Sequence, residues 1–194
     1  MNDIIAKHPM DGVRYTKPVR AVDDIHFLTR EEPAIFWETA KRSHNYRQYV
    51  LLLETGLRTS ELIGLTWDSI DWKKHTLSIN KTLEYRHQNK CWRAGPPKTE
   101  KSYRTIPLTD RAYAVLKSCY DERDSRKESD TLSQVLEYMD RRTGRTGALV
   151  MKDLVFINYR TGEPAKNSSY DTHLYKLCDE AGIEHFCMHA LRHT

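Results

Sequence analysis

The spacing of apolar residues along this chain is mostly helical. Apolar side chains recur every third or fourth residue in several segments. This pattern predicts helices over residues 29–40, 46–53, 59–65, 110–123, 129–142 and 167–181, with a last helix beginning near His189. Helix start and stop signals stand at Thr29 with Glu32, at Thr59 or Ser60, at Gly56 and at Gly182.

Two short segments alternate apolar and polar residues instead, which is typical of strands. Residues 76–80 would turn Leu77 and Ile79 inward, and a second strand is predicted over residues 103–107, after a loop through Gly95-Pro96-Pro97. Residues 154–157 are predicted to form a further short strand. We therefore expect a mainly α fold with one small antiparallel β-sheet.

Length and composition favour one globular domain, alone or with an appendage. The chain has 194 residues, of which 30% are charged and 39% are hydrophobic. Residues 1–24 contain helix breakers and scattered basic residues, so we expect a linker there and the domain over residues 25–194. The sequence has neither an apolar run of membrane-spanning length nor the apolar core of a signal peptide, so a cytoplasmic location is expected. Its four cysteines show no CxxC spacing and are expected to be free thiols.

Basic residues are concentrated more than the net charge of +4 suggests. One cluster, with a single acidic residue in it, comprises Lys90, Arg93, Lys98, Lys101 and Arg104. A second comprises Arg141, Arg142 and Arg145. Solvated surface is the ordinary explanation for such clusters. Phosphate binding becomes the better one because two arginine motifs elsewhere also suit an anion.

The first of these motifs is Thr55-Gly56-Leu57-Arg58-Thr59-Ser60-Glu61. Arg58 follows a predicted tight corner between two helices, and a guanidinium fork there can hold a phosphate by two hydrogen bonds. Glu61 lies three residues further on and can orient Arg58. The alternative is an ordinary corner with a surface ion pair of little energetic value.

The second motif is His189-Ala190-Leu191-Arg192-His193-Thr194, which places His189 and Arg192 one helical turn apart. His185, Cys187, His189 and His193 also raise the possibility of zinc. Against zinc, the H-E-x-x-H pattern is absent and Arg192 would put a fixed cation beside the metal. We expect no metal and no other cofactor.

A lysine on a basic turn lies between the two motifs in sequence. Lys98 follows Pro96 and Pro97 and precedes the predicted strand at 103–107, and its ammonium can donate a proton to a leaving oxygen. Lys101 is the rival candidate, and a solvated loop lysine is the ordinary alternative.

Three strings together resemble the catalytic domain of tyrosine recombinases, the phage and conjugative-transposon integrase family: TGLRTSEL, PKT followed by R-x-I-P-L, and HALRHT. The resemblance covers roughly residues 25–194 and implies site-specific DNA recombination by metal-free phosphoryl transfer. It assigns catalytic roles to Arg58, Lys98, His189, Arg192 and Glu61. The basic cluster adds Arg93, Lys101 and Arg104 as DNA-binding candidates. Double-stranded DNA is the expected partner, with sister protomers in a synaptic tetramer when the protein is full length, in association with the nucleoid.

The family's nucleophilic tyrosine lies C-terminal to the second arginine motif, whereas all eleven tyrosines of this chain precede His189. We therefore expect the nucleophile beyond the end of this chain, and the 194 residues alone to be inactive in strand cleavage. Residues 1–24 would then join an N-terminal core-binding domain. Two alternatives stay open: a non-catalytic DNA-binding remnant of an integrase, and the less similar type IB topoisomerases.

Overall fold

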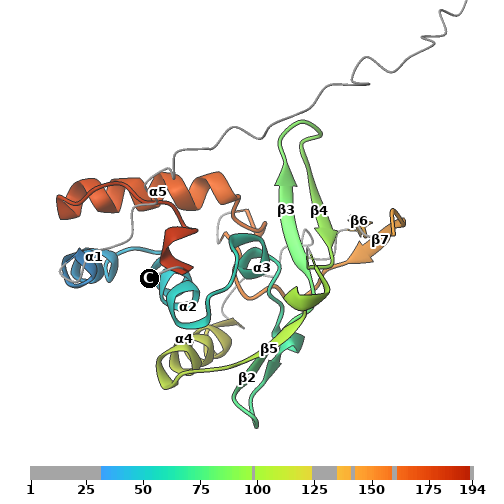
Figure 1. Ribbon diagram of the computed structural model, residues 1–194, viewed down its shortest axis with the longest axis horizontal. Coiled ribbons are helices and arrows are strands. Elements are labelled where there is room, and N and C mark those ends of the chain that lie inside the picture. The colour runs from blue at the N-terminus through green and yellow to red at the C-terminus, as the bar shows by residue number, and fades with distance from the viewer. Residues whose placement is uncertain (1–31, 98, 124–134, 141–142, 159–160, 193–194) are drawn as a thin grey trace, which may run out of the picture.

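The computed structural model describes residues 32–97, 99–123, 135–140, 143–158 and 161–192 (Figure 1). Its α-helices are α1 Glu32–Ala40, α2 Tyr46–Thr55, α3 Thr59–Ile63, α4 Asp110–Asp121 and α5 Asn167–Ala181. Short 3-10 turns include η1 Trp67–Ser69, η2 Glu100–Ser102 and η5 Ala190–Arg192. The strands are β1 Ile70–Asp71, β2 Thr76–Ile79, β3 Thr82–Arg86, β4 Cys91–Gly95, β5 Arg104–Pro107, β6 Val135–Met139 and β7 Thr146–Val150.

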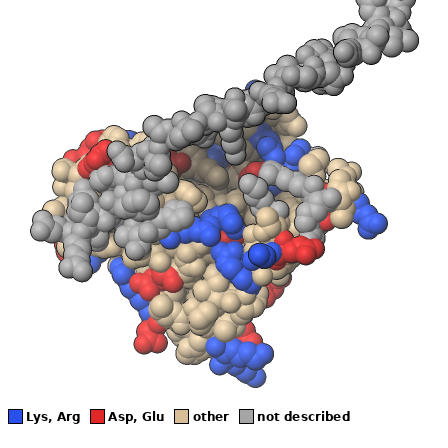
Figure 2. Space-filling view, in the orientation of Figure 1, with Lys and Arg blue, Asp and Glu red and all other residues tan. Residues whose placement is uncertain are grey.

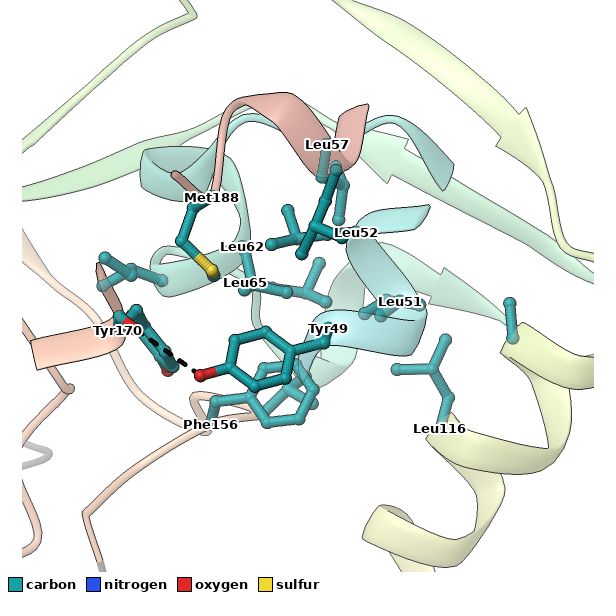
Figure 3. Packing of buried hydrophobic residues seen from close by; sticks show 14 of the residues in the cluster. Tyr49, Leu51, Leu52, Leu57, Leu62, Leu65, Leu116, Phe156, Tyr170 and Met188 are labelled. Carbon is teal, nitrogen blue, oxygen red and sulfur yellow. Dashed lines mark hydrogen bonds between the residues drawn. The ribbon is translucent and has the colours of Figure 1, made fainter. Parts of the chain in front are cut away.

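Helix α2 lies at the centre of the helical part. It packs against α4 and against η5, while α1 packs against α5 (Figure 1). Its residues Tyr49, Leu51 and Leu52 are fully buried, and the Tyr49 hydroxyl donates to the backbone carbonyl of Tyr170 on α5 at 3.5 Å (Figure 3). Burial of these large side chains joins α2 and α5 in one core. Among the described residues, no helix is both long and apolar enough to cross a bilayer.

The strands form two small sheets beside the helices. β1, β2 and β5 form an antiparallel sheet in which Leu77 pairs with Ile106, and Leu77 and Ile79 are buried as predicted. β3, β4, β6 and β7 form the second sheet, in which the β3–β4 hairpin projects beside α3 (Figure 1). The predicted mainly α architecture with a small antiparallel sheet is confirmed, although the described strands form two sheets and the pairing of β4 with β6 is parallel.

Three segments differ from the prediction. The predicted helix over residues 129–142 is wrong where the structure describes it, because β6 pairs along its whole length with β7 and also pairs with β4. A short apolar run fits either period, and cross-strand pairing decided between them. The predicted strand at residues 154–157 is also wrong, since Leu154 makes only an isolated bridge to Thr66. The β3–β4 hairpin lies where a loop was expected, and the predicted linker falls in residues outside the description.

The close approach of α3 to the β3–β4 hairpin generates a prediction. Gly64 caps the C-terminus of α3, and a Cβ there would lie 2.8 Å from the backbone nitrogen of Leu83. A backbone atom cannot rotate away, so Gly64→Ala should lower the free energy of unfolding by about 1–3 kcal/mol in urea titrations. Gly147→Ala is the matched control, because a Cβ there meets nothing within 4 Å, and it should change stability by less than about 0.5 kcal/mol. Equal effects at the two positions would contradict this.

Candidate functional site

The corner between α2 and α3 fixes the position of Arg58. Gly56 ends α2 in the left-handed conformation, with φ of 61°, and its N–H donates to the Leu52 carbonyl at 2.9 Å. Arg58 then adopts an extended conformation and occupies the N-cap position of α3. The expectation that Thr59 or Ser60 caps this helix is therefore wrong. The predicted tight corner itself is present, with the Arg58 side chain 38% exposed beside it.

The Glu61 carboxylate is the buried centre of the site. Glu61 is only 2% exposed, yet both of its oxygens are fully engaged. Its Oε1 accepts from Nη1 of Arg58 at 2.8 Å and from Nη1 of Arg104 at 3.1 Å. Its Oε2 accepts from the backbone N–H of Arg58 at 2.9 Å and from Nη2 of Arg104 at 2.8 Å. Glu61 thus holds both the backbone and the side chain of Arg58.

The protonation state of Glu61 follows from these contacts. Burial raises the pKa of its carboxyl, but the hydrogen bonds from Arg104 and Arg58 outweigh burial, so the pKa lies below its usual value. Glu61 is therefore charged at neutral pH. A buried carboxylate without partners would be costly, so the two arginines are what keep this charge inside the fold.

Arg192 approaches the same corner from the end of the described chain. It closes η5, which packs against α2, and a Cβ at Gly56 would lie 3.9 Å from its Cγ. Burial lowers the pKa of the Arg192 guanidinium and repulsion from Arg58 lowers it further, while Glu61 partly offsets both. The charge of Arg58 thus acts on Arg192 at this corner. Exposed His189 precedes η5, and its carbonyl accepts the N–H of Arg192 at 3.2 Å.

The three DNA-binding candidates, Arg93, Lys101 and Arg104, differ in their exposure and in their contacts with Arg58 and Glu61. Arg93, on β4, lines a pocket of about 140 Å³ together with Arg58 and Glu61. Lys101 is exposed on η2, whereas Arg104 on β5 turns its guanidinium onto Glu61 and keeps its side chain 26% exposed. Lys and Arg side chains gather near the centre of one face of the molecule (Figure 2). Lys98, His193 and Thr194 lie outside the described residues.

Sequence analysis missed the hydroxyl groups beside the arginines. Ser102 is 4% exposed, and its hydroxyl accepts from Nη1 of Arg58 at 3.3 Å and lies 2.9 Å from the Thr99 hydroxyl. Its backbone carbonyl accepts from Nη1 of Arg104 at 3.1 Å. No local pattern marks a serine in a charged loop as buried, so only the three-dimensional arrangement reveals it. Within the described part of the chain, no group of three or more His, Cys, Asp or Glu side chains could hold a metal ion.

The amino-acid sequence is similar to those of known transposases and recombinases. The transposase from transposon Tn916 of Enterococcus faecalis is 28% identical over 207 residues, covering 100% of this chain and 45% of the relative. A XerC-like tyrosine recombinase of Caldanaerobacter subterraneus is 26% identical over 201 residues, covering 98% of this chain and 48% of the relative. The chain thus spans about half the length of these relatives.

Solved structures show the same fold. The Tn1549 transposon integrase in complex with transposon right-end DNA superposes with a TM-score of 0.70 at 20% identity, over 90% of this chain and 53% of that one. XerA recombinase superposes with a TM-score of 0.60 at 20% identity, over 92% of this chain and 50% of the XerA chain. The model of the phage integrase family matches residues 27–194, which include both arginine motifs and the buried Glu61 at the end of the first. The chain therefore belongs to the phage integrase family.

Proposed function

We propose that this chain carries the phosphate-binding part of the active site of a site-specific DNA recombinase, of the kind that integrates mobile elements. The observation that carries the proposal is the approach of Arg58 and Arg192, from distant parts of the sequence, to one corner. Two arginine side chains at one corner, whose positive charges repel each other, suit an anion that both can bind. The integrase, transposase and recombinase relatives support the same reaction, and because the chain spans half their length the activity of the whole protein is part of this proposal.

The proposed reaction is a transesterification at one DNA phosphate. A tyrosine hydroxyl attacks phosphorus, a bond from phosphorus to the tyrosine oxygen forms, and the bond from phosphorus to the 5′-oxygen breaks. Arg58 and Arg192 stabilise the charge that builds on the non-bridging oxygens. Lys98 gives the leaving 5′-oxygen its proton, and His189 assists proton removal from the nucleophile. Glu61 orients Arg58, and no metal takes part.

The nucleophile is the missing group in this scheme. Tyr49 and Tyr170 are buried in the core, and Tyr103 is an exposed tyrosine next to Arg104. By the resemblance stated above, we assign the attack to a tyrosine outside these 194 residues. Double-stranded DNA is then the substrate, and sister protomers in a tetramer exchange strands on the nucleoid.

A second candidate function is DNA binding without chemistry, by a remnant of an integrase. It is favoured by the burial of Tyr49 and Tyr170, whose hydroxyl groups cannot reach DNA from the core. Both functions use the same phosphate-binding surface, so they differ in covalent chemistry and not in affinity.

DNA binding should be strongly salt-dependent, because the proposed contacts are to phosphates. Fluorescence anisotropy with a duplex oligonucleotide should give a log Kd that rises linearly with log salt. Replacing exposed Lys101 by Ala should reduce that slope by about 1 and weaken binding to unrelated duplexes equally. Lys117→Ala is the control, because Lys117 on α4 already pairs with Asp121 at 2.7 Å. This variant should leave the slope unchanged. Salt-insensitive binding by the unaltered chain would contradict the proposed phosphate contacts.

Covalent chemistry separates the two candidate functions. The 194-residue chain should form no covalent complex with nicked duplex carrying its recombination site, as judged by a denaturing gel with labelled DNA. The protein extended through the reading frame that follows Thr194 should form one, and Arg192→Ala in that protein should reduce it at least about 100-fold, as loss of a charge stabiliser does. No covalent band from the extended protein would favour the remnant. A band from the 194 residues that Tyr103→Phe removes would place the nucleophile within this chain.

A further inference from the structure

Arg104 differs from exposed Lys101 because its side chain is only 26% exposed. Its Nη1 donates to Glu61 and to the carbonyl of Ser102, both at 3.1 Å, and its Nη2 donates to the other oxygen of Glu61 at 2.8 Å. The fork is therefore aligned with both oxygens of a buried carboxylate. Three of the five N–H groups of this guanidinium thus bond to the protein, so its main contacts are with the protein itself.

The contacts continue from Glu61 to Arg58. Each carboxylate oxygen accepts one hydrogen bond from Arg104 and one from Arg58, so the two arginines share Glu61 evenly. Without Arg104, the buried carboxylate would have Arg58 as its remaining hydrogen-bond donor among these groups. It would then draw that guanidinium inward and neutralise the charge that a phosphate needs.

We propose that Arg104 is a positioning residue, which satisfies Glu61 so that the guanidinium of Arg58 stays available to a phosphate. This rests on the proposed function, in which Arg58 binds the scissile phosphate. It replaces the direct DNA contact that the sequence suggested for Arg104 with an indirect action through Glu61.

The same arginine also fixes the turn next to Lys98. Arg104 holds the carbonyl of Ser102, while the Ser102 hydroxyl contacts Arg58 and Thr99. Thr99 is the N-cap of η2 and directly follows Lys98 in the sequence. Arg104 therefore ties the turn that follows the expected lysine to the corner that carries the first expected arginine.

Thermal unfolding of the 194-residue chain against pH tests this without DNA. In Arg104→Ala, Glu61 stays buried but loses half of its donors, so the pKa of its carboxyl should rise. The charged carboxylate then destabilises the fold above that pKa, and protonation relieves the cost as pH falls. The Tm of Arg104→Ala should be lower than that of the unaltered chain by about 5–10 °C at pH 7, with the gap narrowing toward pH 4.

The charged groups that act on Glu61 in this region are Arg58, Arg104 and Arg192, from α3, β5 and η5. The double variant Arg104→Ala with Glu61→Gln removes the unpaired charge and should recover part of the Tm at pH 7. Lys117→Ala removes a cation whose carboxylate partner Asp121 is exposed, so it should lower Tm by less than 2 °C at each pH, within the range of surface pairs. A Tm loss in Arg104→Ala that is equal at all pH values would show an ordinary structural role and overturn the proposal.

DNA binding gives the second readout. Arg104→Ala should weaken duplex binding, and adding Glu61→Gln should restore it, because Arg58 is then released from the unpaired carboxylate. Weaker binding by Arg104→Ala that Glu61→Gln does not restore, together with an unchanged Tm, would make Arg104 a direct phosphate contact and overturn the proposal. If the unaltered chain binds no DNA, the proposed function fails, while the pH-dependent Tm signature of Arg104 still decides its action on Glu61.

Discussion

The site is organised by one buried carboxylate held between two guanidinium groups. Glu61 lies on α3, Arg58 at its start and Arg104 on β5, so this contact joins the helical part of the domain to the β1–β2–β5 sheet. Removing a carboxylate from water costs several kcal/mol, which well-aligned hydrogen bonds can offset. Each arginine supplies half of the hydrogen bonds to the carboxylate, so the position of Arg58 depends on residues from both parts.

The hydrophobic core fixes the position of helix α2, at the end of which this contact lies. Tyr49, Leu51 and Leu52 bury the inner face of α2, and Gly56 then reverses the chain so that Arg58 emerges at the surface. Residues of η5 pack against the same helix, which brings Arg192 over the corner. Packing of α2 and η5 thus brings Arg58 and Arg192 to one corner, and hydrogen bonds to Glu61 set the orientation of Arg58.

Local signals predicted the local structure. The stop at Gly56, the helix that ends before Gly182 and the inward turn of Leu77 and Ile79 all depend on neighbours in sequence, and the structure confirms them. The segment that became β6 was misassigned because its partners β4 and β7 determine its state. Arg104 and Glu61 lie 43 residues apart in the sequence, so the periodicity of apolar residues could not predict their pairing. Family motifs supplied Arg58 and Arg192, but their surroundings came only from the structure.

The charge balance of the cluster suits the reaction proposed for it. Among the described residues, three guanidinium groups, of Arg58, Arg104 and Arg192, act on one carboxylate, which leaves two positive charges. A phosphodiester carries one negative charge and gains more as a fifth oxygen approaches phosphorus. An excess of positive charge therefore stabilises the transition state more than the bound substrate, which is the condition for catalysis. Glu61 limits the repulsion among the arginines before DNA binds, because its carboxylate accepts hydrogen bonds from the side chains of two of them.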